Sequence, residues 1–271
     1  MAIDCERIQR RLGELGVATD SPDFLNNTEW IAYVGEHPEL LETFAAFVIC
    51  RNYSNDYLDE SERVIRIAAE TLNKEIVSDG RRGACIDAAG VLSQILEKEG
   101  IWSFQVGGSL TGEFPAESGI DPMHFYSKDI GRDFVVAHSW VVAPPFKIID
   151  VTIKEQDHHQ GVADYLPACV LQKEVEPANF GVEEFCSPRF IREAERHGVN
   201  KLQLRVNLRT GLGNFHSSFP VVAFGTDNQV KLKYIPAGIK SFDGPLEANR
   251  SLQLNGRHGL EIYEKLIKPK V

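Results

Sequence analysis

The sequence predicts an α+β fold in which helices pack against an antiparallel sheet. Apolar side chains recur at helical spacing over residues 5–15, 38–51 and 59–77, which predicts a helical first quarter. A further helix is expected over residues 84–98, where a run rich in Ala, Leu and Ile ends at Gly100. Strand-like patterns begin only after this point, so we expect the helices to precede the sheet along the chain.

Runs rich in β-branched and aromatic side chains follow in the middle of the chain. Strands are expected at residues 101–107, 134–142 and 147–153, with a double-proline turn between the last two. Residues 108–133 contain glycine, proline and serine without a clear period, which predicts a long loop. The expected order is therefore helix, strand, long loop, strand, turn and strand.

The last part of the chain mixes both patterns. Residues 201–208 alternate between polar and apolar side chains, which predicts a strand, and two more strands are expected at 219–225 and 229–235. Residues 259–268 are expected to form a closing helix. This part is therefore expected to be mixed and rich in β-structure.

The 271 residues are enough for one large domain or two modest ones. We expect residues 1–78 to form a helical region packed on the core, residues 79–155 to form the core, and residues 156–271 to form a mixed α/β region. No motif assigns a role to the third part, and no long flexible linker separates the three.

The charge balance excludes a broad electrostatic attraction to nucleic acid. Lys and Arg number 29 and Asp and Glu number 39, so the formal charge is 29 − 39 = −10. Such a surface repels phosphate backbones, and the pair Arg81-Arg82 is too short to form a basic patch. The N-terminus is charged and no run approaches about 18 apolar residues, so we expect a cytoplasmic protein without a membrane partner.

The number and spacing of the cysteines argue against a disulfide framework and against a structural zinc site. The count is odd, the spacings are wide and no C-x-x-C pair occurs. A reducing compartment is the simplest interpretation. The five are Cys5, Cys50, Cys85, Cys169 and Cys186.

Cys85 has the sequence context of a nucleophile. It follows a turn with glycines at Gly80 and Gly83 and begins the apolar helix expected over 84–98. A helix N-terminus favours the thiolate and offers unpaired N–H groups to a developing oxyanion. A lone cysteine is more often a small buried residue, so this position alone would be weak support for catalysis.

His138 and Asp150 supply the partners that such a thiol needs. His138 lies in the strand-like run FVVAHSWVV, and Asp150 ends the apolar run KIID twelve residues later. A hairpin through the double proline would place the two runs side by side. A carboxylate in a buried strand needs a partner, and Asp150 could hold the His138 imidazole in the correct tautomer. The three residues therefore predict a Cys-His-Asp triad.

Three short motifs occur in a fixed order. They are G-A-C at residues 83–85, whose helix ends in Gly-Ile at 100–101, then A-H-S-W at 137–140, then I-D-V-T at 149–152. Together they resemble the transglutaminase-like branch of the papain-like cysteine enzymes. In that family a glycine lies two residues before the nucleophile, the histidine lies two residues before a tryptophan, and the aspartate lies in a D-x-T context. The resemblance covers residues 79–153.

The resemblance implies a papain-like core with the nucleophile at a helix N-terminus packed on an antiparallel sheet. It assigns the nucleophile to Cys85, the base to His138 and the orienting acid to Asp150. Gly83 and Trp140 are the residues of this motif set that we expect at the substrate cleft.

Some positions depart from the family's pattern. Val151 stands where the family often has proline, and residues 108–133 lengthen the gap between the nucleophile and the base. No motif marks the side chain that completes the oxyanion hole, for which Asn52, Asn55 and Asp79 are candidates.

The expected activity is cysteine-dependent acyl transfer through a thioester, most simply the hydrolysis of a peptide or amide bond. The substrate would be a protein, a peptide or a small amide. Amide formation of the transglutaminase type and a non-catalytic binding module on the same scaffold are the alternatives. No cofactor is implied, and the sequence leaves the oligomeric state open.

Two groups of polar residues resemble metal ligands only loosely. Neither spacing matches a standard ligand set, so no metal site is predicted. One group is expected in a solvent-exposed loop, and the other in loops and turns or in a lid over the active site. The first group contains Asp157, His158, His159 and Asp164, and the second contains Asp121, His124, Asp129 and Asp133.

Overall fold

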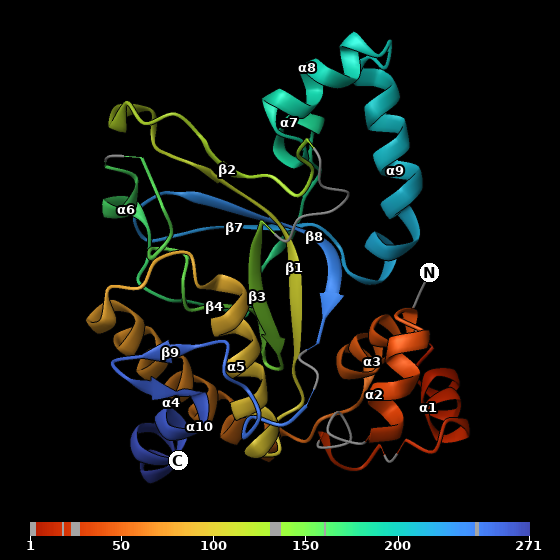
Figure 1. Ribbon diagram of the computed structural model, residues 1–271, viewed down its shortest axis with the longest axis vertical. Helices are drawn as coiled ribbons and strands as arrows, with labels where there is room; N and C mark the ends of the chain where they lie inside the picture. The colour runs from red at the N-terminus through yellow and green to blue at the C-terminus, as the bar shows by residue number, and fades with distance from the viewer. Residues whose placement is uncertain (1–3, 18, 23–27, 131–136, 160, 242–243) are drawn as a thin grey trace.

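The computed structural model describes the chain except for residues 1–3, 18, 23–27, 131–136, 160 and 242–243 (Figure 1). The fold is mixed α+β, with helices arranged around one antiparallel sheet. The predicted fold class is therefore confirmed at this level.

The described part of the first hundred residues forms five α-helices, four of which were predicted from apolar spacing, while α2 was not. Local signals fix the ends of these helices. Asp4 caps the first by accepting a hydrogen bond from the Arg7 N–H at 3.0 Å, and Ser54 caps the fourth. Gly80 ends the fourth helix with a left-handed φ of 74°. The helices are α1 (Cys5–Glu14), α2 (Thr28–Glu36), α3 (Glu39–Cys50), α4 (Asn55–Asp79) and α5 (Cys85–Lys98).

The main sheet has eight strands, and each pair of neighbours is antiparallel. The order is β5-β4-β3-β1-β8-β7-β6, and β2 pairs with β1 off this path. A hairpin with the predicted double-proline turn joins β3 to β4, and its Pro144-Pro145 bond is cis. The strands are β1 (Phe104–Glu113), β2 (Met123–Phe125), β3 (His138–Ala143), β4 (Phe146–Asp150), β5 (Val170–Gln172), β6 (Glu176–Pro177), β7 (Val222–Gly225) and β8 (Lys231–Lys240).

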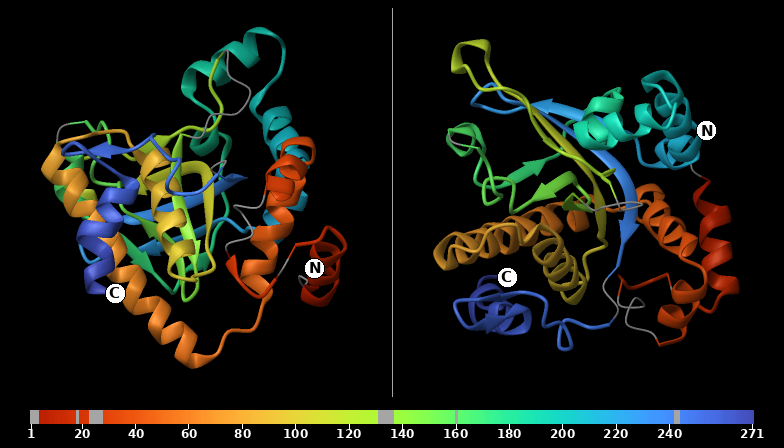
Figure 2. Two further views of the ribbon diagram at one scale, coloured as in Figure 1. Left: turned by 60° about the horizontal axis from the view of Figure 1, so that its bottom comes forward. Right: turned by 45° about the horizontal axis from the view of Figure 1, so that its top comes forward.

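The two edges of this sheet are consecutive in the sequence. β5 and β6 lie at opposite ends of the strand order, yet only residues 173–175 separate them. Such a connection spans at most roughly 14 Å, so the sheet must curl until its edges approach each other. Figure 2 shows the bend in β8, which follows this curl. The curled sheet therefore has an inner face and an outer face.

Each face is covered by its own hydrophobic core. On the outer face, Val141, Ala143 and Ile149 belong to the core that contains the buried side of α4 and α5. On the inner face, Val106 and Trp140 belong to the core that also contains side chains of α3 and α9. Alternate residues of β3 therefore serve different cores, as a strand buried on both faces requires.

The rest of the chain surrounds the sheet with short elements and one long helix. These are α6 (Val162–Tyr165), α7 (Val182–Phe185), α8 (Pro188–Arg196), α9 (Lys201–Ser218), α10 (Gly259–Ile262), and the two-stranded sheet of β9 (Gln253–Leu254) and β10 (Arg257–His258). A π-helical turn (Tyr263–Ile267) and a 3-10 turn (Lys268–Lys270) follow α10. The closing helix predicted over 259–268 is therefore helical throughout but irregular.

The strand predicted at 201–208 is wrong, because these residues begin α9. Asn200 and Gln203 form a reciprocal capping box that starts the helix. The apolar alternation misleads because Leu202 and Val206 are 69% and 54% exposed, while Leu204 is buried. Because two of these apolar side chains are exposed on the helix, the sequence showed the apolar–polar alternation that is typical of a strand.

The long loop predicted over 108–133 is wrong in part. β1 continues to Glu113, and Met123–Phe125 returns as β2 to pair with it. Glycines at 107, 108 and 112 hide this strand in the sequence. At Gly108 the reason for glycine is close backbone approach, since a Cβ there would lie 2.1 Å from the Ile235 carbonyl oxygen. Of the strand predicted at 134–142, residues 134–136 lie outside the described residues.

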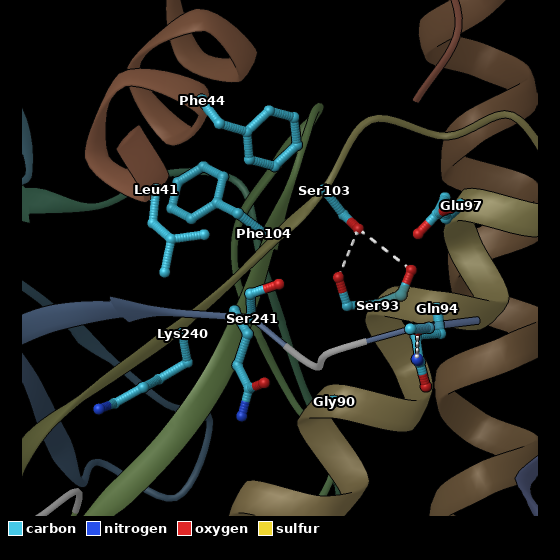
Figure 3. A pocket seen from close by; sticks show the side chains of 12 residues that line it. Leu41, Phe44, Gly90, Ser93, Gln94, Glu97, Ser103, Phe104, Lys240 and Ser241 are labelled. Carbon is cyan, nitrogen blue, oxygen red and sulfur yellow. Dashed lines mark hydrogen bonds between the residues drawn. The ribbon is translucent and has the colours of Figure 1, made fainter. Parts of the chain in front are cut away.

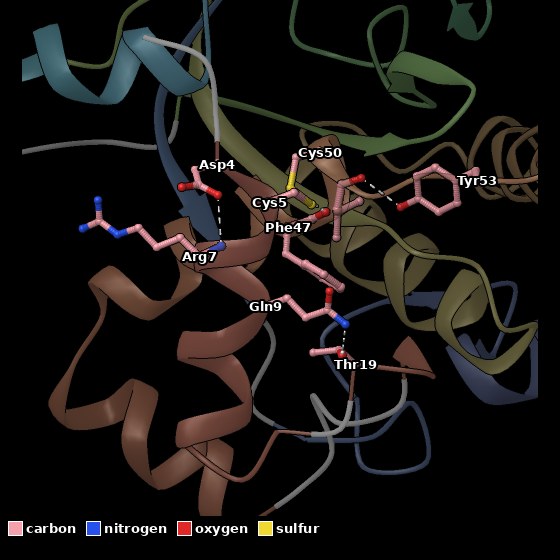
Figure 4. Close-up of a disulfide and its surroundings, with 9 residues drawn as sticks. Asp4, Cys5, Arg7, Gln9, Thr19, Phe47, Cys50 and Tyr53 are labelled. Carbon is pink, nitrogen blue, oxygen red and sulfur yellow. Dashed lines mark hydrogen bonds between the residues drawn. A yellow bond between two sulfur atoms is a disulfide. The ribbon is translucent and has the colours of Figure 1, made fainter.

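A disulfide joins Cys5 of α1 to Cys50 of α3 (Figure 4). The cysteine count and spacing had argued against disulfides, and this bridge corrects that expectation. An odd number of widely spaced cysteines does not reveal that two of them pair and three remain free. The pair lies where α1 packs on α3, with the two Cα atoms 5.5 Å apart. Cys85, Cys169 and Cys186 are free.

Within the described part of the chain, every helix is too short or too polar to cross a membrane.

Thiol titration tests the disulfide. Without reductant, the denatured protein should expose three reactive thiols, and reduction should raise the number to all five. Cys5→Ser should lower the free energy of unfolding by up to about 4 kcal/mol, because the bridge spans 45 residues. Cys169→Ser is the control that leaves the bridge intact. Five reactive thiols before reduction would contradict the assignment.

Candidate active site

Cys85 is the first residue of α5, at an N-terminus that no side chain caps. Gly83 has a left-handed φ of 68°, which turns the chain into the helix, and its N–H donates to the Glu155 carbonyl at 3.0 Å. The thiol therefore lies at the positive end of the helix dipole, beside N–H groups that the helix cannot satisfy. The residue is 5% exposed, so only a small part of it reaches solvent.

His138 begins β3 and is fully buried. Its Nε2–H donates to Asp150 Oδ2 at 2.5 Å. The strand register explains this contact. Val141 pairs with Ile149, which places Asp150 opposite Trp140 and diagonal to His138.

The Asp150 carboxylate accepts four hydrogen bonds. Besides His138, the Tyr234 hydroxyl donates to Oδ2 at 3.0 Å, and Thr152 donates to Oδ1 from its N–H at 2.9 Å and from its hydroxyl at 3.2 Å. A buried carboxylate needs this many donors to remain ionised. Both oxygens of Asp150 are thus held in place.

The pKa of His138 is raised and the pKa of Asp150 is lowered from their ordinary values. Burial alone would lower the pKa of His138, but the Asp150 carboxylate and then the Cys85 thiol outweigh burial and raise it to about 10. Burial alone would raise the pKa of Asp150, but His138, Thr152 and Tyr234 lower it on balance. The buried pair is therefore an imidazolium and a carboxylate at neutral pH.

Because Nε2 is bonded to Asp150, Nδ1 is the ring nitrogen of His138 that remains available to the Cys85 thiol. Nδ1 is buried and makes no hydrogen bond of ordinary length and geometry to any described residue. Cys85 is nevertheless close enough to raise the pKa of the ring through hydrogen bonding and charge. The thiol therefore lies beside the imidazole without being locked to it, as is common in ligand-free catalytic sites.

Aromatic rings enclose the imidazole. The ring of Phe125 lies 5.4 Å from that of His138, centroid to centroid, and the rings of Tyr234 and Trp140 lie at 6.4 Å and 6.5 Å. Trp140 was predicted at the substrate cleft, but it is 1% exposed and lies behind the imidazole on the inner face. Gly83, the other predicted cleft residue, is exposed two residues before Cys85.

Two contributors escape sequence reasoning. Tyr234 lies on β8, 84 residues from Asp150, in a strand with no motif of its own. Gln105 of β1 donates from Nε2 to the Ile86 carbonyl at 3.0 Å and to the Ser139 hydroxyl at 2.8 Å, which ties the first turn of α5 to the sheet. The one available signal was a polar side chain within an apolar strand, since a polar group buried there needs a hydrogen-bond partner.

The three suggested oxyanion donors do not lie at the site. Asn52 and Asn55 precede or begin α4, whose 25 residues separate them by roughly 36 Å from the turn that leads to Cys85. Asp79 is exposed, and its Oδ1 accepts the Asn255 N–H at 2.6 Å.

One of the loop histidines borders the site. His158 is half-buried, donates from Nε2 to the Ile153 carbonyl at 2.7 Å and meets Phe125 edge-on, and burial lowers its pKa. It is therefore not the solvent-exposed loop residue that was expected. His159 is exposed.

The second group of polar residues is dispersed. Asp129 accepts a hydrogen bond from the Ser187 hydroxyl, and His124 is bonded to Thr111, while Asp133 lies outside the described residues. In the described ranges no three His, Cys, Asp or Glu side chains converge to hold a metal.

A small pocket between α3, α5 and β1 is a separate feature (Figure 3). Ser93 and Ser103 are hydrogen-bonded at 3.0 Å beside it, and Gln94 also lines it. Its volume of about 20 Å³ has room for a water molecule and not for a substrate.

Comparison with protein-family models, with curated proteins and with solved structures gave no match to this chain.

A tyrosine variant tests the role of the carboxylate's donors. Tyr234→Phe keeps the ring but removes a hydrogen bond to a buried charge, so it should lower the free energy of unfolding by roughly 1.5–3 kcal/mol. Tyr53→Phe is the matched control, because its hydroxyl donates to the neutral Val48 carbonyl and should be worth only about 0.5–1.5 kcal/mol. Equal losses in urea unfolding of the two variants would contradict an ionised Asp150.

Proposed function

We propose that this chain is a cysteine-dependent acyl-transfer enzyme with a papain-like core of the transglutaminase-like kind, and that it hydrolyses a peptide or amide bond. The observation that carries the proposal is the 2.5 Å contact between buried His138 and Asp150, next to a thiol at the N-terminus of α5. A buried imidazole with one nitrogen held by a carboxylate and the other beside a thiol is the arrangement that activates a nucleophile.

The first half of the reaction acylates the cysteine. The Cys85 thiolate attacks the carbonyl carbon and forms a C–S bond, while the carbonyl π electrons move to oxygen. The unpaired N–H groups of the first turn of α5 stabilise that oxyanion. The intermediate then collapses, the C–N bond breaks, and the His138 imidazolium gives its Nδ1 proton to the departing amine. The products are a thioester and neutral His138.

The second half releases the acyl group. Neutral His138 takes a proton from water as the water oxygen attacks the thioester carbon. The C–S bond breaks, a carboxylic acid leaves, and the Cys85 thiolate is restored beside an imidazolium. Asp150 stays ionised throughout and keeps the ring oriented.

A primary amine in place of water would make the same site a transferase. Water is the simpler acceptor, because no described feature marks a binding site for an amine. A non-catalytic binding module is a second candidate, and the 5% exposure of Cys85 favours it, since a substrate carbonyl must reach the sulfur.

Alkylation by a small haloacetamide tests the activated thiolate. At neutral pH Cys85 should react faster than the other free thiols, because the N-terminus of α5 and the adjacent imidazole favour attack by its sulfur. His138→Ala should remove this advantage. The reagent must be small because the thiol is nearly buried, and peptide mass mapping should locate the label.

Cys169 provides the internal control for this experiment. It is a free, half-buried thiol whose pKa is raised by burial, so it should stay unlabelled on the same time scale. Equal, slow labelling of both cysteines would contradict the activated thiolate and favour the binding module.

The choice of acceptor is tested with an activated ester. The protein should release acetate from p-nitrophenyl acetate, and adding a primary amine such as putrescine should give no amide product by mass. Cys85→Ser controls for background hydrolysis. Exclusive formation of the amine adduct would overturn hydrolysis in favour of transfer while leaving the triad intact.

A further inference from the structure

The inner face of the curled sheet contains an apolar pocket of about 320 Å³. Its floor is made of side chains that are buried from solvent, among them Phe104, Val106, Trp140, Ile148 and Phe219. These come from β1, β3, β4 and the residue that follows α9, so the curl of the sheet forms the pocket. Its volume lies at the lower end of the range for small-molecule sites, roughly 300–1,000 Å³.

The rim of the pocket is open and carries one charge. Val142, Val175 and Val222 are half-buried at the rim, and Ile49 of α3 is 42% exposed there. Lys147 is the charged residue among those that line the pocket, and no ion pair or hydrogen bond to a described residue occupies its ammonium group.

The nearby acidic residues lie outside this lining. Glu174 and Glu176 flank Val175 and are exposed, but neither is among the residues that line the pocket. Lys173 in the same segment pairs with Glu62 of α4. Lys147 is therefore the charged side chain that the lining itself contributes at the mouth.

An apolar floor, an open mouth and an unpaired cation are together complementary to an amphipathic anion. Water in such a pocket finds few polar partners, so an apolar chain displaces it favourably. A carboxylate on that chain would meet Lys147 at the mouth, where desolvation is incomplete and the charge retains its attraction.

We propose that the inside of the curled sheet is a binding site for a small amphipathic carboxylate, such as a medium-chain fatty acid. The apolar chain lies against Trp140 and the carboxylate meets Lys147. The site is distinct from the triad: Trp140 forms its floor and separates it from His138, with the two ring centroids 6.5 Å apart. The proposal requires no reaction at Cys85.

Titration calorimetry with decanoate tests the proposal, carried out on full-length Cys85→Ala so that no acyl transfer contributes. Saturable binding at one site is expected. Affinity should rise about tenfold for each added pair of methylenes from hexanoate to decanoate, because each buries more apolar area. Trp140 fluorescence should change with the same midpoint, and Trp140→Phe should remove most of that change.

Variants at the mouth and rim separate the two parts of the site. Lys147→Glu should weaken decanoate binding at least tenfold and leave the neutral analogue decanol unaffected. Lys74→Glu, an equal charge change on exposed α4, should alter neither. Val142→Phe and Val222→Phe should weaken both ligands by filling the pocket, with circular dichroism confirming the fold.

Two kinds of result would contradict this proposal. Absence of binding, or binding that both rim variants leave unchanged, would overturn the site. Equal loss of decanoate and decanol in Lys147→Glu would overturn the role of the carboxylate. Because none of these measurements depends on catalysis, they are independent of the outcome of the Cys85 labelling.

Discussion

The buried contact between His138 and Asp150 is the interaction on which the rest of the structure depends. Moving two ionisable groups out of water costs several kcal/mol for each group unless they are paired and hydrogen-bonded. Both residues are buried here, and the carboxylate is satisfied by donors from three separate segments of the chain. The pair therefore constrains the register of β3 on β4, the turn at Thr152 and the placement of β8. Removing His138 would leave the buried carboxylate without its cationic partner, and removing Asp150 would leave the buried imidazole without its hydrogen-bond acceptor.

The same contact explains how a helix and a sheet come to share one site. α5 lies on the outer face, whereas the His138 ring lies among the aromatic side chains of the inner face. They meet at the end of the sheet where β3 begins, because Gln105 holds the first turn of α5 to the sheet and Gly83 is bonded to the Glu155 carbonyl. Cys85 and His138 thus lie at the boundary between the two hydrophobic cores, and the apolar pocket lies on the inner side of that boundary.

Sequence reasoning succeeded where the signal was local. Helical spacing and end signals predicted four of the first five helices and missed α2, and the placement of Cys85, His138 and Asp150 on a helix and two strands was predicted from their motifs. It failed where the feature depends on the packing of segments that are distant in the sequence. α9 was misread because its apolar residues are exposed, and the bridge between Cys5 and Cys50 depends on the packing of two helices. The donation from Tyr234 and the apolar pocket arise only when the sheet curls, which no short segment encodes.

The central claim is that Asp150 and Cys85 keep His138 protonated at neutral pH. The imidazole nitrogen NMR shifts of His138, followed from pH 5 to 11, measure this directly. We expect a protonated ring through neutral pH that titrates near 10, with a lower midpoint in Cys85→Ala and a still lower one in Asp150→Asn. A wild-type ring that titrates near the ordinary value of about 6.5, unchanged in both variants, would contradict the account.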